Sequence, residues 1–480
     1  MLRTAKVAGR RVSVAAAFGV VLGLGLSTCG AAQSLNETLA AAYRSNPSLH
    51  AERARLRAVD ENVALARSGF LPTVGASVAG RIDNTQSSTT ENVANGINGE
   101  SRSNSYGVAV HQPVFRGFRT VNAVNQAEAS RLAGQETLRT AEQTVLLAAV
   151  TAHMDVVTSL RLVQASERSV SLLRQLLSQT ERRFKDSDVT QTDVALSRSR
   201  FAGATVTLEA ARANYKASRA RFEEVVGLAP ANLRYPRLPL RLLPPSLEAA
   251  LDAANEESPI IGAAYFREIA AHHAANTITG ELLPEIGING SYSHEEITGA
   301  GAGITNSIAA EIRMSVPIFD GGAVRSRVRQ AKHIQYSLRQ EVEQYRNQVR
   351  QQTISVWSIY SANSVQAQGR RVQLQSVEIA LKGLREEEAL GQRTVGNVLD
   401  GLQEVINAQV GLALIERDTI VNAYAVLASV GRLTMNNIAV IDEQEIYRPE
   451  EHAAKVRHDA WTTAVTYGDK EPDKRRSPAQ

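Results

Sequence analysis

Apolar and polar side chains alternate strictly over several short stretches of the chain, which is the pattern of β-strands with two different faces. In residues 73–83, Val74, Val78 and Ile82 share one face, and polar or small residues occupy the other. The same alternation returns at three further places, residues 105–111, 285–293 and 308–316. The pattern therefore predicts two strand hairpins, at about 73–115 and about 284–317. A polar loop is expected from about Asn84 to Asn104 in the first, and a shorter, glycine-rich loop in the second.

After each strand hairpin, apolar residues recur at every seventh position, which is the spacing of coiled coils. In the first half the series runs through Ala149, Val156, Val163, Val170, Leu177 and Phe184 and returns through Val194, Phe201, Leu208, Tyr215 and Phe222. In the second half it runs through Val342, Val349 and Val356, shifts register to Val365, Val372 and Ile379, and returns through Val398, Val405, Leu412 and Val426. These series predict long helical hairpins at about 119–226 and about 321–430, with the first arm about 100 Å long at 1.5 Å per residue.

A shorter helix precedes each strand hairpin. The first is expected to begin at Asn36 as its N-cap, to be interrupted early by Pro47, and to end before Leu71-Pro72. Leu283-Pro284 stands at the equivalent place in the second half.

The two halves are copies of one unit. Leu71-Pro72 and Leu283-Pro284 lie 212 positions apart, and Pro113 and Pro317 lie 204 apart after one insertion or deletion. Self-similarity at a fixed offset indicates a repeated structural unit. The predicted organisation, after an N-terminal segment, is a first repeat at 33–227, a connector at 228–245, a second repeat at 246–431 and a C-terminal segment at 432–480 with a disordered tail.

The strand hairpins favour a membrane β-barrel. Strands of about 10 residues with one apolar face suit a barrel with lipid outside and water inside. Soluble hairpins packed on a helix would alternate in the same way, but here very long helices flank each hairpin and leave its apolar face uncovered. One chain supplies only four strands, and membrane barrels close with eight or more because open edges are not tolerated in lipid. The protein must therefore oligomerise, with two copies giving eight strands and three giving twelve.

The N-terminus is typical of a secretory signal peptide. Basic residues precede a 15-residue apolar stretch, and small residues follow it, which predicts a signal peptide at 1–32 with cleavage after Ala32. Cys29, the single cysteine, would leave with that peptide. The alternative is a lipobox ending at Cys29, which would retain it as an acylated first residue, although Thr28 fits that motif poorly. No other segment reaches the roughly 18 apolar residues of a membrane-spanning helix.

Composition and the motifs present argue against several classes of function. The formal net charge of +4 is small for 480 residues and no basic block stands out, so no nucleic-acid partner is expected. Phosphate-binding glycine loops, zinc-type Cys/His spacing and GxSxG nucleophile motifs are missing from the sequence. His272, His273 and His294 are interpreted as surface or junction histidines. We expect no enzyme, no cofactor and no metal site.

Four motifs, in register in both halves, carry a family resemblance over about residues 35–435. They are QPVFRG (112–117), VPIFDGG (316–322), VTQTDV (189–194) and GQRTVGNVLD (391–400). The chain closely resembles the TolC family of outer-membrane exit ducts. The resemblance implies a mixed α and β membrane protein, in which three chains share a 12-stranded β-barrel, four strands per chain, continued by a long α-helical coiled-coil tunnel.

The resemblance also implies location and partners. It places a homotrimer in the outer-membrane lipid of a Gram-negative bacterium, extending into the periplasm. There it would dock a periplasmic membrane-fusion adaptor and an inner-membrane pump of the RND, ABC or MFS type.

The same resemblance assigns candidate site residues at the helical turns, where the tunnel entrance would lie. Asp400 matches one carboxylate of a constricting ring, while Asn397 replaces the other with an amide. Arg393 matches the arginine of a latch between the turns, Thr192 and Asp193 match its partners, and Glu388 replaces a tyrosine. Pro113 and Gly117, with Pro317 and Gly321, mark the strand-to-helix junctions.

Two functions from different classes follow from these observations. The first is a passive outer-membrane exit duct of a tripartite efflux pump or a type I secretion system. The alternative is a periplasmic structural or adaptor protein with helical hairpins and no membrane barrel. The transported substrate cannot be deduced from the sequence, because the pump partner would select it.

Overall fold

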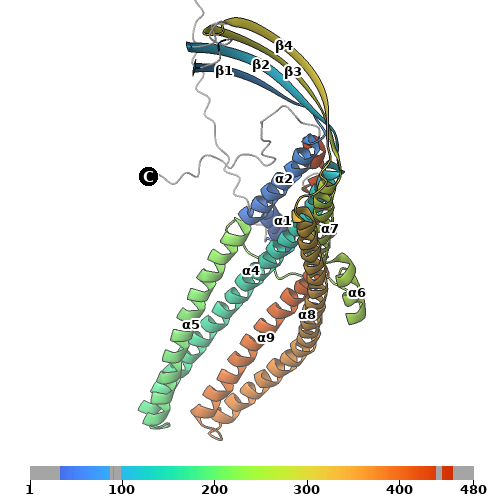
Figure 1. Cartoon of the computed structure of the whole chain (residues 1–480). Coiled ribbons are helices and arrows are strands. Elements are labelled where there is room, and N and C mark those ends of the chain that lie inside the picture. The colour runs from blue at the N-terminus through green and yellow to red at the C-terminus, as the bar shows by residue number, and fades with distance from the viewer. Residues whose placement is uncertain (1–32, 87–89, 91–98, 439–445, 458–480) are drawn as a thin grey trace, which may run out of the picture.

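The protein is an elongated molecule with a curved sheet at one end and two long helical hairpins at the other (Figure 1). The computed structural model describes residues 33–86, 90, 99–438 and 446–457. The predicted signal peptide at 1–32, with Cys29, lies outside the described residues, as does the tail from 458 onward.

Two short helices begin the described chain, α1 (Leu35–Ser45) and α2 (Pro47–Ser68). The N-cap of α1 is Ser34 and not the predicted Asn36, because Ser34 forms a capping box with Glu37. Asn46 caps α2 through its side chain, and Pro47 stands at the first helical position, where it has no N–H to leave unpaired. Pro47 therefore starts a second helix rather than interrupting a single one.

Four antiparallel strands form one sheet in the order β1-β2-β3-β4. They are β1 (Thr73–Thr85), β2 (Gly99–Arg116), β3 (Glu285–Gly299) and β4 (Gly303–Ser315). All four exceed the expected length of about 10 residues, and β2 begins at Gly99, inside the predicted polar loop. Along β2 from residue 101 to 108, the odd-numbered residues are half-buried and the even-numbered ones are exposed. The odd-numbered, polar face of the sheet is therefore less exposed to solvent than the apolar face.

The helical end consists of α4 (Arg119–Lys185) with α5 (Gln191–Val226) and of α8 (Ala323–Ala389) with α9 (Val395–Ser429). Most of the seven-residue series is buried along these hairpins, including Val156, Val163 and Leu208 in the first and Val349 and Val405 in the second. The shifted series of α8 differs, because Val365, Val372 and Ile379 are exposed on the single chain.

The remaining helices surround the middle of the molecule. They are α6 (Leu247–Glu257), α7 (Pro259–Thr279) with the 3-10 turn η1 (Gly280–Leu282), α10 (Met435–Ile438) and α11 (Pro449–Val456). The largest cluster of buried apolar side chains lies in this middle region and joins α1, α2, α4, α5 and α9. His153 of α4 is fully buried there, with Nδ1 2.9 Å from the Thr38 hydroxyl and Nε2 2.8 Å from the Arg234 carbonyl. This histidine ties the connector to α4.

Two helices, α4 and α9, each contain an 18-residue window apolar enough to cross a membrane by length and composition. The sequence pattern did not single out these windows. Much of the α4 window is buried inside the protein, so its apolar residues are explained by the central core.

Candidate functional site at the tips of the helical hairpins

The two helical turns at the far end of the molecule repeat the same capping structure. Thr190 caps α5 and Thr394 caps α9, each through a capping box with the residue three positions on. In the first, an Asp193 carboxylate oxygen accepts hydrogen bonds from the Thr190 backbone N–H at 3.0 Å and its hydroxyl at 2.7 Å. In the second, Asn397 Oδ1 accepts the same two bonds from Thr394 at 3.1 and 2.8 Å. Both predicted site residues are therefore engaged within their own turn.

Asp400 makes a contact that joins the two hairpins. Its Oδ1 accepts a hydrogen bond from Nη2 of Arg200 at 2.8 Å, so a carboxylate of α9 is paired with a guanidinium of α5. Both side chains are substantially exposed. The carboxylate predicted for the entrance is therefore matched by a positive charge from the same chain.

Glu388 makes a second contact between the hairpins. It accepts a hydrogen bond from the guanidinium of Arg183, which links α8 to α4. Arg393 instead bonds Glu387 of α8 at 2.9 Å, within its own hairpin. Thr192 lies exposed in the first turn of α5. The single chain therefore brings together Arg183 with Glu388 and Arg200 with Asp400, and it does not bring Arg393 to Thr192 or Asp193.

Sequence reasoning missed the two arginines, and the repeat does not identify their partners. The repeat-related positions of Arg183 and Arg200 are Glu387 and Glu404, whereas the observed partners are Glu388 and Asp400. These pairs depend on how the two hairpins pack against each other.

The first strand-to-helix junction is tightly packed. The ladder between β2 and β3 shifts register at Pro113, as expected where a residue has no N–H to donate. Gly117 has φ +58°, and a Cβ there would lie 2.2 Å from the carbonyl oxygen of Gly280. Glu285 at the start of β3 pairs with Arg116 at 3.0 Å and with Arg119 at 2.6 Å. These contacts fix the direction in which α4 leaves the sheet.

The second junction has the same residues but lacks neighbours within the chain. Pro317 follows the end of β4, and Gly321 has φ +69° with open space where a Cβ would be. Asp320 accepts hydrogen bonds from the backbone N–H groups of Gly322 and Val324, which satisfies the start of α8. The second junction is thus preformed and uncovered.

Comparison with known proteins identifies the family. The family described as "Outer membrane efflux protein" matches residues 38–228 and 250–432, which are the two repeats. The chain belongs to the outer membrane efflux protein family. Outer membrane efflux protein BepC of Brucella suis biovar 1 (strain 1330) is 32% identical over 447 residues, covering 92% of this chain and 93% of BepC. Outer membrane protein TolC of Escherichia coli (strain K12) is 24% identical over 443 residues, covering 88% of each chain.

The fold agrees with that of a solved channel. The crystal structure of the Campylobacter jejuni CmeC outer membrane channel matches with a TM-score of 0.75 at 13% identity, over 88% of this chain and 89% of that chain. The predicted fold class, a membrane barrel with a helical tunnel built from a tandem repeat, is confirmed. So are the predicted outer-membrane location and the predicted function as an exit channel for efflux or secretion. The assigned roles of the entrance residues stay predictions.

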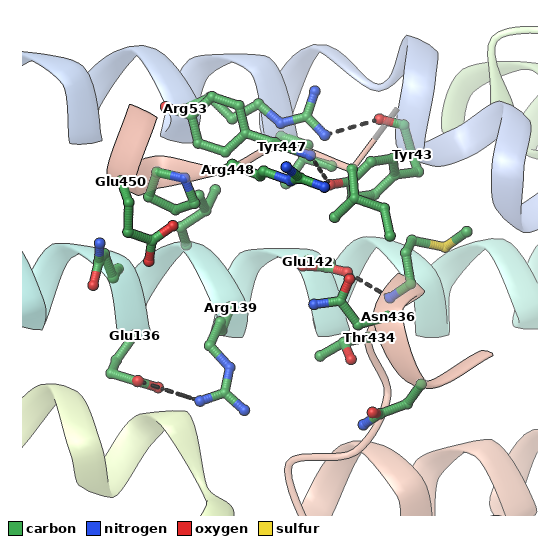
Figure 2. Close-up of a pocket in the computed structure, with 17 residues that line it drawn as sticks. Tyr43, Arg53, Glu136, Arg139, Glu142, Thr434, Asn436, Tyr447, Arg448 and Glu450 are labelled. Carbon is green, nitrogen blue, oxygen red and sulfur yellow. Dashed lines mark hydrogen bonds and ion pairs between the residues drawn. The ribbon is translucent and has the colours of Figure 1, made fainter. Parts of the chain in front are cut away.

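This outer membrane efflux protein also has a cavity of about 700 Å³ in its middle region, between α2, α4 and the C-terminal segment (Figure 2). Both signs of charge line it, and their polar groups are largely engaged. Glu142 accepts the Met435 backbone N–H at 2.7 Å, and Arg139 pairs with Glu136 at 2.9 Å. Arg53 lies over the rings of Tyr43 and Tyr447. We interpret these contacts as the attachment of the C-terminal segment to α2 and α4.

Proposed function

We propose that three copies of this chain form a passive duct whose periplasmic entrance is held closed by ion pairs between the two helical hairpins of each copy. The four-stranded sheet has two open edges, β1 and β4, which lipid does not tolerate. Three copies would supply twelve strands. The family is one of channel proteins, and we propose that this member has no catalytic activity of its own.

Energy for transport must then come from partners. Among the described residues, no group of three or more His, Cys, Asp or Glu side chains could hold a metal ion. We propose that a periplasmic membrane-fusion adaptor and an inner-membrane pump of the RND, ABC or MFS type drive transport and open the entrance.

One observation carries the proposed mechanism: Arg200 with Asp400 and Arg183 with Glu388 bridge the tips of the two hairpins. Apolar residues of both hairpins also pack together there, among them Leu173 of α4 and Leu399 of α9. Exposed ion pairs contribute about 0.2–1 kcal/mol each to stability, so a single pair stabilises the closed entrance only weakly. Three copies of the Arg200–Asp400 pair would contribute roughly 1.5 kcal/mol in total, which is about a tenfold change in a two-state equilibrium. An entrance closed by such pairs opens readily when a partner binds the open form more tightly.

The test is the conductance of purified protein in planar lipid bilayers. Arg200→Ala should raise the open probability roughly tenfold by removing the pair from all three copies. Arg198→Ala is the matched control, because Arg198 pairs with Glu181 at 2.9 Å inside the first hairpin. Within the described part of the chain, it has no ion pair with the second hairpin. Equal conductance for the parent and Arg200→Ala would exclude this pair as a latch.

Ion selectivity tests the charge assignment of the entrance separately. Pairing with Arg200 leaves Asp400 with little net negative charge to attract cations. Asp400→Ala should therefore shift the reversal potential in a salt gradient toward anion selectivity, whereas Arg200→Ala should shift it toward cation selectivity. The double variant should return close to the parent value. Potentials unchanged in both single variants would remove the two residues from the constriction.

A further inference from the structure

The open edges of the sheet carry enough information to define how one copy meets the next. Resting on the proposed trimeric barrel, we propose that β4 of one copy pairs with β1 of the next in a single register, which places Glu311 directly opposite Arg81 of the next copy. The same register places Ser315 opposite Ser77 of the next copy. The occupant of each edge is thus a second copy of this chain.

The internal repeat predicts strand pairing correctly where the structure allows a check. Positions in β1 and β3 are related by an offset of 212, and positions in β2 and β4 by an offset of 204. In the first hairpin Thr73 pairs with His111. The offsets convert that pair into Glu285 with Ser315, which is the pair observed in the second hairpin. The two halves therefore form their hairpins in the same register.

The same conversion can be applied to the pairing between the two halves. Within the chain β2 pairs with β3, and the repeat-related contact joins β4 to the β1 strand of another copy. Gly107 pairs with Ser293 within the chain, which converts to Glu311 with Arg81 of the next copy. His111 pairs with Asn289, which converts to Ser315 with Ser77 of the next copy.

Charge independently favours this register over the one shifted by two residues. Among the residues that the structure describes, Arg81 bonds along its own strand to Asp83 at 2.8 Å, and Glu311 likewise bonds Arg313 at 3.0 Å. In the proposed register Arg81 of one copy lies opposite Glu311 of the other. Each also has a residue of opposite charge two positions along its own strand, Asp83 for Arg81 and Arg313 for Glu311. A shift that paired Arg81 with Arg313 would also pair Asp83 with Glu311, and like charges directly opposite each other are destabilising. A shift by one residue would turn apolar side chains toward the polar face.

On the apolar face, residues at the β4 edge are more exposed than their repeat-related residues on β2. Ile312 on the edge strand β4 is 75% exposed, whereas its repeat-related residue Val108, on the central strand β2, is 45% exposed. Phe319 is 81% exposed and lies beyond the end of β4, while its counterpart Phe115 pairs with Ile286 in the ladder. The register would pair Phe319 with Val74 of the next copy. Residues 316–320 would then extend β4 as residues 112–116 extend β2.

Cysteine cross-linking tests the register in the full-length protein in outer membranes. Ser77→Cys combined with Ser315→Cys should give a covalent trimer with a mild oxidant or a short thiol-reactive linker. The two positions lie on opposite edge strands of one four-stranded sheet, and these strands are about 14 Å apart at 4.8 Å per strand. Within one chain Ser77 lies level with Ser307 and not with Ser315, so the two positions are farther apart still and a link must join two copies. Thr73→Cys with Ser315→Cys is the matched control, displaced by four residues on the same face. The parent protein gives the background without engineered cysteines.

The outcomes of this experiment test the register and the trimeric duct separately. A covalent trimer with the first pair and none with the control would support the register. Linking by the control pair, or by neither pair in a protein that remains an outer-membrane trimer, would overturn the register and leave the duct intact. A soluble or monomeric protein would overturn the proposed duct together with the seam.

Discussion

Asp193 and Asn397 occupy equivalent positions in the two turns, and each side chain folds back onto the threonine that caps its helix. The sequence placed these residues correctly in the turns, because Thr at the N-cap and Asp or Asn three residues later favour such caps. It could not give the orientation of the longer side chains. Arg393 follows a run of three glutamates, 386–388, in the sequence, and only the folded turn decides that it bonds Glu387.

Glu142 permits a test of how burial and charge balance at one residue. Burial raises its pKa above the ordinary value, and this effect outweighs the Met435 N–H and the nearby arginines Arg53 and Arg139, which lower it. The folded state then binds a proton more tightly than the unfolded state does. Stability should therefore fall as pH rises through the window between the ordinary pKa and the raised one.

Glu142→Gln should remove this pH dependence, because the neutral amide can still accept the Met435 N–H. We expect the variant to be more stable than the parent at pH 8 by on the order of 1 kcal/mol, with the difference shrinking toward pH 4. Thermal unfolding followed by circular dichroism at both pH values measures it. Lower stability of the variant at pH 8 would show that the ionised carboxylate stabilises the fold.

At the level of elements, the sequence predicted every long helix and all four strands, because period and proline placement are local signals. The sequence was a poorer guide to features that depend on which element packs alongside. The shifted series Val365, Val372 and Ile379 keeps coiled-coil spacing, yet these side chains are exposed in the single chain, and Ala367 and Leu381 are buried instead. Periodicity identifies an apolar stripe on a helix but not which helix covers it. The early end of β4 has the same cause, since its expected partner strand belongs to another copy.

The first strand-to-helix junction should depend on one glycine. Gly117→Ala would place a Cβ at positive φ and 2.2 Å from the Gly280 carbonyl, so we expect a loss of about 2 kcal/mol or more. Gly203→Ala provides the contrast, because Gly203 lies inside α5 with open space around it and should gain about 0.5–1 kcal/mol. Chemical unfolding of the purified protein compares the two. A tolerated Gly117→Ala would mean that the backbone at this junction relaxes easily.

At the scale of the whole molecule, the helical hairpins resemble the sheet in having outer edges that no described element of the same chain covers. The outer helices of the two hairpins, α5 and α8, form the outer edges of the helical end (Figure 1). Within the chain α4 packs against α9. The repeat relates α4 to α8 and α9 to α5, so the same packing between copies would place the exposed stripe of α8 on α5 of the next copy. Val206 of α5, 71% exposed, is an apolar side chain available for that contact.

This packing predicts that Val372 and Ile379 stabilise the assembly and not the single chain. Replacing both with Asn should lower the temperature at which the trimer dissociates by several degrees or more, because each apolar side chain contributes about 1.5–3 kcal/mol when fully buried. Gln373→Asn is the control, an exposed position of α8 at which no apolar side chain is lost. The helix content of the monomer should be equal in both variants, since the stripe touches little within its own chain. If the double variant dissociates at the parent temperature, the stripe faces solvent or the lumen, and the contact between copies must be made by other residues of α5 and α8.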